Sequence, residues 1–154
     1  GEWPLRLEPH STEIIADRLR LRLNSLSDPD RARIRIQTEN QMQALVDLML
    51  VEYVWGILIS NALRFSDAPS IIEARLYSTR REFHLQVLDR GVGIPSGESP
   101  APFKPGHRLS NAGNRHGPGL GLYLGAMAAF VHNGSLTLLA RPGGGSTAEA
   151  TFVS

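Results

Sequence analysis

The segment Asp-Arg-Gly-Val-Gly at residues 89–93 combines a carboxylate with two glycines. It follows residues 82–88, in which apolar and polar residues alternate, and this alternation predicts a half-buried strand that ends at Asp89. At such a position the carboxylate of Asp89 can accept hydrogen bonds, and Gly91 and Gly93 allow another group to approach the backbone closely. The same residues are also common in simple turns, so this segment alone does not decide between a binding site and a turn.

A second candidate is Asn61, the only side-chain amide in the apolar segment WGILISNALRFS at residues 55–66. The pattern of this segment is typical of a helix. An amide oxygen is a hard ligand of the kind that Mg²⁺ prefers, and Mg²⁺ usually binds few protein groups besides phosphates and waters. A buried asparagine that bonds only to backbone would fit the same pattern.

The third candidate is the segment GPGLGL at residues 117–122, which opens a helical stretch that runs to His132. Backbone N–H groups at the N-terminus of a helix point outward without partners, and the helix dipole favours an anion there. The glycines that would present these groups are Gly117, Gly119 and Gly121.

Two other nucleotide-binding motifs are excluded. A Walker A loop needs Gly-Lys-Ser/Thr, whereas the only lysine, Lys104, lies between Phe103 and Pro105. The Rossmann fingerprint G-x-G-x-x-G would need a glycine at Leu122 or Leu124.

Composition excludes several classes of protein. The chain has 154 residues and no cysteine, which excludes disulfides and thiolate metal sites and suits a reducing compartment. With 16 basic and 15 acidic residues, the net charge of +1 gives no reason to expect binding to nucleic acid or to a membrane surface. The longest apolar run, residues 44–59, contains Asp47 and Glu52, so no bilayer span is expected and the chain should be a soluble, globular piece.

The remaining patterns predict a mixed α/β (α+β) fold: a two-layer sandwich in which helices cover one face of a mostly antiparallel mixed sheet. Residues 94–116 are polar, with four prolines and three glycines, and a long segment of this kind is usually functional or mobile. The expected strands lie at residues 33–37, 70–77, 82–89, 136–140 and 147–153, and residues 5–7 form either a short strand or the end of a linker. The first expected helix begins at Ser11 or Thr12 and ends before residues 27–30, and two further helices cover about 39–65 and 119–132. Asn133-Gly134 should end the last helix, and the glycine-rich residues 141–145 should form the turn between the last two strands.

Taken together and in this order, Asn61, the D-x-G-x-G segment and GPGLGL resemble the N, G1 and G2 boxes of the ATP-binding domain of sensor histidine kinases. That domain belongs to the ATPase superfamily shared with type II topoisomerases, heat-shock chaperone ATPases and mismatch-repair ATPases. The C-terminal GGGSTAEATFV fits as well, so the resemblance covers roughly residues 5–153. It implies one domain over residues 1–154, with a mobile ATP lid at about residues 94–116.

The resemblance also implies roles for individual residues. Asn61 would hold the Mg²⁺ of Mg–ATP, and Arg64 would contact phosphate, although a solvated surface charge would look the same in the sequence. Phe65 would line the adenine pocket or belong to the core, and Asp89 would accept a hydrogen bond from the adenine amine. The other implied ATP-binding residues are Gly91, Gly93, Ile94, Arg115, Gly117, Gly119, Leu120 and Gly121.

The chain departs from the family pattern at two places. Four residues before Asn61, where the superfamily usually carries Glu or Asn, stands Ile57, which can neither accept a proton nor orient water, so hydrolysis should be feeble. In the lid, Phe103 matches the second aromatic of the F box, but Pro100 stands in place of the first. Further candidates for contact with the γ-phosphate are Arg108, Arg115 and His116.

The function implied is transfer of the γ-phosphoryl group of ATP to a histidine on a separate dimerisation domain, with a response regulator acting downstream. None of the five histidines lies in a His-Glu-x-x-x-Pro-like sequence, so the acceptor is expected upstream or on another chain. Two alternatives stay open: a degenerate regulatory pseudokinase, and an anti-sigma-factor-like serine kinase of the same fold. The expected location is the cytoplasm, as a free protein or as part of an inner-membrane sensor.

Overall fold

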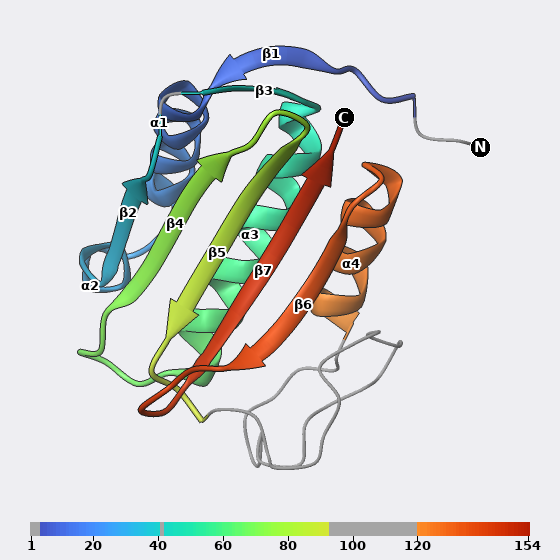
Figure 1. Cartoon of the computed structure of the whole chain (residues 1–154). Helices are drawn as coiled ribbons and strands as arrows, with labels where there is room; N and C mark the ends of the chain where they lie inside the picture. Colours follow the sequence, from blue (N-terminus) through green and yellow to red (C-terminus); the bar gives the residue numbers. More distant parts are fainter. Residues whose placement is uncertain (1–3, 41, 93–119) are drawn as a thin grey trace.

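A five-stranded sheet forms one layer of the molecule. The computed structural model describes residues 4–40, 42–92 and 120–154. The strand order is β2-β4-β5-β7-β6 (Figure 1), in which β2 and β4 are parallel and the other neighbours are antiparallel. The bounds are β2 Ile34–Thr38, β4 Ile72–Ser78, β5 Glu82–Asp89, β6 Ser135–Ala140 and β7 Ser146–Val153. The predicted mixed, mostly antiparallel sheet is confirmed.

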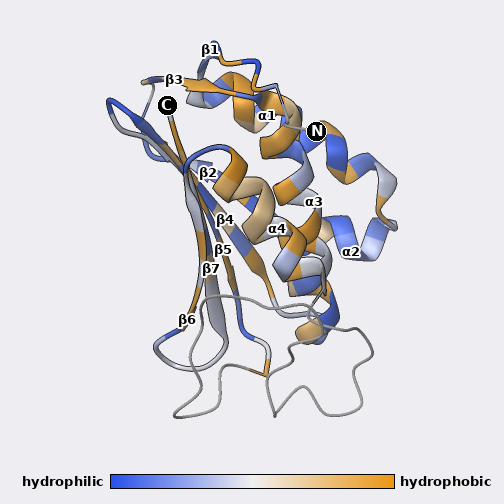
Figure 2. Cartoon of the chain, turned by 90° about the vertical axis from the view of Figure 1, so that its right-hand side faces the viewer, coloured by the Kyte–Doolittle hydropathy of each residue, from blue (hydrophilic) through white to orange (hydrophobic). Residues whose placement is uncertain are grey.

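The helices form the second layer and lie on one face of this sheet, as Figure 2 shows with the sheet seen nearly edge-on. A short two-stranded antiparallel sheet, β1 Glu8–Ser11 with β3 Gln43–Val46, lies at the upper end in Figure 1. The helices are α1 Thr12–Arg22, the 3₁₀ turn η1 Leu23–Ser25, α2 Asp28–Ala32, α3 Leu48–Phe65 and α4 Leu120–Val131. The two-layer α/β sandwich is therefore the observed fold.

Helix α3 is the central helix of this layer. Asp47 caps its N-terminus, because the side chain of Asp47 accepts a hydrogen bond from the backbone N–H of Leu50 at 3.2 Å. The buried residues of α3 recur at spacings of three and four, so they lie on one face of the helix. The buried residues of β5 recur mostly at every second position, so they lie on one face of the strand. The two sets share one core, with Val51, Val54, Trp55 and Leu58 on α3 and Phe83, Leu85 and Val87 on β5.

By length and composition alone, α3 could cross a bilayer, and it is the one helix in the described ranges that meets this test. Eight of its 18 residues are nevertheless buried inside the protein. This helix therefore has the burial expected of a core helix.

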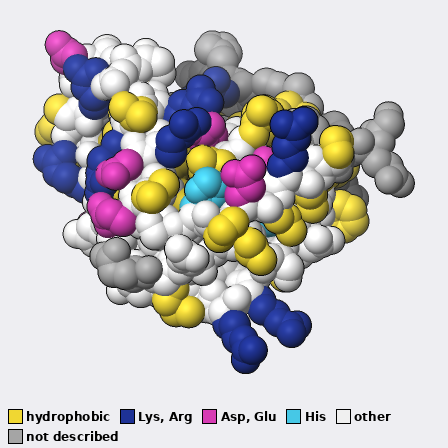
Figure 3. All heavy atoms as spheres, turned by 90° about the horizontal axis from the view of Figure 1, so that it is seen from above, with side chains coloured by type: hydrophobic (Ala, Val, Ile, Leu, Met, Phe, Trp, Pro, Cys, Tyr) yellow, Lys and Arg dark blue, Asp and Glu magenta, His cyan; other side chains and the backbone are white. Residues whose placement is uncertain are grey.

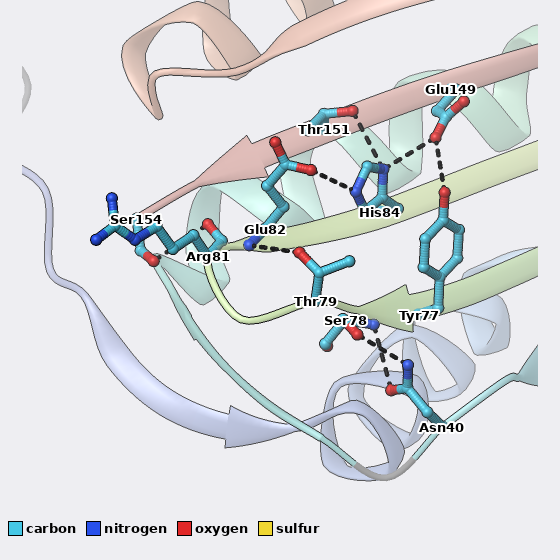
Figure 4. Close-up of polar contacts among 10 residues, drawn as sticks. All are labelled: Asn40, Tyr77, Ser78, Thr79, Arg81, Glu82, His84, Glu149, Thr151 and Ser154. Carbon is cyan, nitrogen blue, oxygen red and sulfur yellow. Dashed lines mark hydrogen bonds and ion pairs between the residues drawn. The ribbon is translucent and has the colours of Figure 1, made fainter.

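The outer face of the sheet, opposite the helices, carries polar side chains that bond to one another (Figure 4). The ring of His84 lies between two carboxylates, with Nε2 2.8 Å from Glu82 Oε2 and Nδ1 3.0 Å from Glu149 Oε1. It also stacks on the ring of Tyr77, whose hydroxyl donates to Glu149 Oε1 at 3.2 Å. Burial and the negative charge of Glu149 raise the pKa of Tyr77 above its usual value. These contacts give the polar groups of this face partners within the sheet.

Three parts of the predicted arrangement of elements differ from the structure. Of the two alternatives for residues 5–7, the short strand is wrong: the first strand is β1, because Glu8–Ser11 are the residues that pair with β3. The predicted long helix at 39–65 begins only at Leu48, since buried Ala44 and Val46 alternate with exposed Leu45 in a strand.

The third error concerns residues 27–30, which were expected only to stop the first helix. Ser27 instead caps α2: its hydroxyl accepts from the N–H of Asp30 at 3.3 Å, and Pro29 occupies the first turn, where no donor is needed. The predicted start of α1 is confirmed, because the hydroxyl of Ser11 accepts from the N–H of Ile14 at 3.1 Å.

Candidate functional site

The C-terminal ends of α3 and β5 meet at one end of the molecule, where the predicted Phe65 and Asp89 come together (Figure 1). The N–H of Val92 donates to the carbonyl oxygen of Phe65 at 3.0 Å. A Cβ added to Gly91 would lie 2.0 Å from that oxygen and 3.0 Å from Asp89 Oδ1. Gly91 is therefore required because the backbone after β5 passes directly against the end of α3.

Asp89 is the last residue of β5, and it is 7% exposed. Its Oδ1 accepts from the N–H of Gly91 at 2.8 Å and from the N–H of Ser146 at 3.3 Å, while its Oδ2 accepts from the Ser146 hydroxyl at 2.9 Å. These three bonds fix the orientation of the carboxylate. A carboxylate has about four acceptor positions, so one further donor, such as a base amine, can still be accommodated.

Ser146 is a site residue that sequence reasoning missed. It enters because the antiparallel register of β5 and β7 places Ser146 directly opposite Asp89. The preceding residue, Gly145, has φ +90°, and a Cβ there would lie 2.0 Å from the carbonyl oxygen of Asp89. The glycine run before Ser146 was predicted as a turn, but its partner strand and register could not be read from that pattern.

Asn61, Arg64 and Gly121, three predicted site residues from two different helices, line one hollow of about 590 Å³. We call this the α3 hollow. Asn61 is half-buried and lies one helical turn before Phe65, so the hollow begins beside the Asp89 end of the site. Its lining consists of Met49, Glu52, Tyr53, Gly56, Ile57, Ser60, Asn61 and Arg64 of α3, Arg22 of α1, Ser25 of η1, and Gly121 of α4.

Ile57 lines the hollow four residues before Asn61, at the position where the family that this sequence resembles usually carries Glu or Asn. Its Cγ2 lies 3.9 Å from a Cβ built on Gly121 and 3.5 Å from one built on Gly125. This apolar side chain therefore packs toward the glycines of α4, and the small residues there leave room for its branched shape. Such a side chain supplies no group that could take a proton from water.

Glu52 does not replace the missing acid. Its Oε1 accepts from Arg18 Nε at 3.0 Å and its Oε2 from Arg22 Nη2 at 3.0 Å. Burial alone would raise the pKa of this carboxyl, but the hydrogen bonds and charges of the two arginines outweigh it and lower the pKa below its ordinary value of 4.5. Glu52 is thus a paired anion rather than a general base.

His132 is a fully buried structural residue. Its Nε2 accepts from the N–H of Asp47 at 2.9 Å, and its Nδ1 donates to the carbonyl oxygen of Val153 at 3.2 Å. These contacts join the end of α4 to the start of α3 and to β7. Because both ring nitrogens are occupied by backbone, His132 cannot act as a phosphoryl acceptor without losing them.

Several predicted residues lie outside the described ranges. These are Gly93, Ile94, Arg115, Gly117 and Gly119, together with the lid at 94–116 and its candidates Phe103, Arg108 and His116. The backbone of Leu120 begins α4, but its side chain is not described.

The described part of the chain contains no cluster of three or more His, Cys, Asp or Glu side chains that could hold a metal ion. A metal near Asn61 would therefore be held by this amide oxygen together with phosphates and waters. That donor set fits Mg²⁺, which keeps several waters and commonly binds through substrate phosphates.

Comparison with known proteins agrees with this geometry. The family described as histidine kinase-, DNA gyrase B-, and HSP90-like ATPase matches residues 46–153. The sensor-like histidine kinase SenX3 of Mycobacterium tuberculosis is 30% identical over 122 residues, which are 77% of this chain and 30% of the relative. The circadian input-output histidine kinase CikA of Synechococcus elongatus is 27% identical over 155 residues, 96% of this chain and 20% of the relative.

Solved structures show the same fold. The mycobacterial sensor histidine kinase MprB has a TM-score of 0.75 at 24% identity, covering 95% of this chain and 97% of that one. The catalytic domain of histidine kinase ThkA has a TM-score of 0.76 at 15% identity, covering 96% and 97%.

The chain spans less than a third of the length of the two curated relatives SenX3 and CikA. With the family match over residues 46–153, the chain belongs to the histidine kinase-, DNA gyrase B- and HSP90-like ATPases.

Proposed function

We propose that this chain is the catalytic ATP-binding domain of a two-component sensor histidine kinase. It would bind Mg–ATP and transfer the γ-phosphoryl group to a histidine on a separate dimerisation domain, from which a response regulator receives it. The observation that carries the proposal is the meeting of Asp89 with the end of α3, one turn from Asn61. This brings a fixed acceptor for a base close to an amide that can bind a metal.

At the base end, Asp89 accepts a hydrogen bond from the exocyclic amine of adenine. Its other contacts, from Gly91 and Ser146, hold the carboxylate in place before the nucleotide arrives. Phe65 lines the base pocket from the end of α3, and Gly93 and Ile94 complete it. A pre-oriented acceptor loses little freedom on binding, which favours affinity.

At the phosphate end, Asn61 holds Mg²⁺, and Arg64 places a positive charge beside the phosphates. Leu120 and Gly121 at the start of α4, with Gly117 and Gly119 just before them in the sequence, would offer backbone N–H groups to the phosphate oxygens. Arg115 adds a cation from the lid at residues 94–116. Catalysis by this site consists mainly of positioning and charge stabilisation, because phosphoryl transfer needs little covalent help from the protein.

Water is a poor acceptor in this site because Ile57 cannot activate it. The histidine that accepts the phosphoryl group lies upstream or on another chain. Residues 1–154 act as one domain, and this domain works in the cytoplasm. The isolated domain therefore binds ATP without consuming it and needs its partner to act as an enzyme.

Isothermal titration with ATP tests the binding step, and incubation with the cognate dimerisation domain and γ-labelled ATP tests the transfer step. Binding followed by acid-labile label on the partner is the expected result. Binding without transfer would indicate a regulatory pseudokinase, and acid-stable label on a serine would indicate a serine kinase of this fold.

A further inference from the structure

The turn between β6 and β7 lies beside the end of β5 (Figure 1). It contains Gly143, Gly144 and Gly145, whose φ angles are +86°, +107° and +90°. Residues with a side chain are strained at such angles, so glycine permits this turn. Glycine also leaves the unfolded chain unusually free, which makes a single conformation costly to hold. A turn of this kind keeps one shape only if neighbouring groups fix it.

Arg90 supplies such contacts from the end of β5. Its Nη1 donates to the carbonyl oxygen of Pro142 at 2.7 Å and to that of Gly144 at 3.0 Å. Hydrogen bonds from a charged donor are roughly twice as strong as those between neutral groups. Arg90 directly follows Asp89 in the sequence, so the turn is bound to the residue next to the proposed adenine acceptor.

The turn and Arg90 fit closely together. A Cβ built on Gly143 would lie 3.1 Å from Arg90 Nη1, and one built on Gly145 would lie 2.7 Å from Arg90 Cα. The second distance is too short for a real contact, so a side chain at position 145 would displace the backbone of Arg90. The turn therefore contacts both the backbone and the guanidinium of Arg90.

Arg141 holds the other side of the turn. Its N–H donates to the carbonyl oxygen of Gly145 at 3.1 Å, and its own carbonyl oxygen accepts from the N–H of Gly144 at 3.0 Å. Its side chain is only 11% exposed, and Nη2 lies 3.6 Å from Glu73 Oε1 on β4. The turn is thus anchored to β4 through Arg141 and to the end of β5 through Arg90.

Ser146 follows Gly145 directly and begins β7. Its N–H donates to Asp89 Oδ1 at 3.3 Å and its hydroxyl donates to Asp89 Oδ2 at 2.9 Å. A displacement of the turn would move both donors at once. Two of the three hydrogen bonds that the described residues make to this carboxylate therefore depend on the position of the turn, and the third comes from Gly91.

Two simpler roles for Arg90 fit these contacts less well. A cation that serves only solubility would have no reason to direct one nitrogen at two carbonyl oxygens, as Arg90 does. A phosphate-binding cation would face Asn61 and Arg64, where the proposed function places the phosphates, but Arg90 Nη1 is directed at the turn. Its contacts are those of a side chain that supports a backbone segment.

Other surfaces offer less. The polar groups of the outer sheet face bond to one another, as His84 does with Glu82 and Glu149. The end that carries β1 and β3 shows basic, acidic and apolar side chains mixed together, without one prevailing kind (Figure 3). Neither surface indicates the chemistry of a ligand.

Building on the proposed function, we infer that Arg90 is a positioning residue for the recognition of adenine. It holds the β6–β7 turn, the turn places Ser146, and Ser146 keeps the Asp89 carboxylate in one orientation toward the exocyclic amine of the base. Arg90 itself does not touch the nucleotide. Because hydrogen bonds are directional, loss of this clamp costs the amine its aligned acceptor, while the rest of the nucleotide keeps its contacts.

Isothermal titration of the chain with ATP and with purine riboside triphosphate, both in Mg²⁺, tests this role. The second nucleotide has hydrogen in place of the 6-amino group, so the preference for ATP over it measures what the amine contributes. Arg90→Met keeps the length of the side chain and removes its donors. We expect this variant to lower the preference for ATP about three- to tenfold, which corresponds to one hydrogen bond. A general loss of stability would weaken both nucleotides equally and leave the preference unchanged.

Two further variants examine the path of the effect. Arg90→Lys should recover most of the preference for ATP, because an ammonium group can donate to both carbonyl oxygens. Ser146→Ala should lower the preference by itself. Adding Arg90→Met to Ser146→Ala should then cost less than Arg90→Met costs in the wild type, because both changes act on the same carboxylate.

Arg35→Met is the matched control. Arg35 is also an exposed arginine whose Nη1 donates to backbone carbonyl oxygens, those of Ala32 at 2.5 Å and Ile34 at 3.4 Å, but it lies on β2. Its replacement should leave the preference for ATP within about twofold of wild type. Thermal melting verifies that each variant is folded, and Arg90→Ala is the second variant should Arg90→Met not fold.

An unchanged preference in folded Arg90→Met or Arg90→Ala, or an equal loss in Arg35→Met, would overturn the positioning role and leave the proposed function intact. A wild-type chain that binds the two nucleotides equally well would overturn Asp89 as the adenine acceptor, and the role of Arg90 with it. A wild-type chain that binds neither nucleotide would overturn the proposed function itself.

Discussion

The hydroxyl of Ser146 donates to Asp89 Oδ2 at 2.9 Å across the antiparallel pair β5 and β7. This bond, with those from the N–H groups of Gly91 and Ser146 to Oδ1, holds the carboxylate both from its own loop and from Ser146, which lies 57 residues further along the chain. The turn that leads into β7 thus becomes part of the base-binding site.

Replacing Asp89 by asparagine should weaken ATP and ADP alike, because adenine is common to both. Loss of a charged acceptor costs roughly 1.5–3 kcal/mol, or about 10- to 100-fold in affinity. Isothermal titration measures this loss, with Ser146→Ala as a milder variant that keeps the carboxylate and removes one of its supports. Equal affinity for wild type and folded Asp89→Asn would rule out Asp89 as the adenine acceptor.

Asn61→Ala should reveal a role through the metal. We expect it to weaken ATP binding strongly in Mg²⁺ and little in EDTA, because without the metal the amide has no ligand to hold. Titrations of wild type and variant in both buffers provide the comparison. A loss of the same size in both buffers would instead show that Asn61 supports the fold.

Two glycines of the site region should respond to alanine in opposite directions. Gly91→Ala forces a Cβ to within 2.0 Å of the Phe65 carbonyl oxygen and should destabilise the domain by about 1–3 kcal/mol. Gly56→Ala meets no neighbour within 4 Å and should stabilise α3 by up to about 1 kcal/mol. Urea unfolding of both variants checks the pair, and a stable Gly91→Ala would contradict the close passage described here.

The pairing of Glu52 with Arg18 and Arg22 predicts a dependence of stability on pH. The pKa of Glu52 is lower in the folded protein than its ordinary value of 4.5, so its stabilising effect is complete above about pH 4.5. As pH falls below 4.5 toward the folded pKa, protonation of Glu52 removes that effect. The difference in unfolding free energy between wild type and Glu52→Gln should therefore shrink as the pH falls below 4.5. A constant difference from pH 7 to pH 3 would refute the ion-pair account.

Much of the fold was predictable because its signals are local. The alternation at residues 82–88 gave β5 directly, and the Asn133-Gly134 stop after α4 is borne out by the positive φ of 60° at Asn133. The boundary errors arose where a short strand precedes a helix without a break: Val46 ends β3 and Leu48 begins α3. Apolar residues of both elements read as one continuous helical pattern.

The candidate site was predictable in part for the same reason. Asn61, Asp89 and Gly91 are marked by their residue types within regular elements. Ser146 was missed because its role depends on strand register, which sequence spacing does not specify. The ion pairs of Glu52 were missed because Arg18 and Arg22 lie on another helix, 34 and 30 residues before Glu52 in the sequence.

Incubation of the chain with γ-labelled ATP, alone and with its cognate dimerisation domain, tests the central claim most directly. Alone, the chain should bind ATP, release almost no phosphate because Ile57 cannot activate water, and leave no acid-labile label on itself. With the dimerisation domain present, acid-labile label should appear on that domain. Rapid phosphate release by the chain alone, or no label on the partner when ATP is bound, would contradict the account.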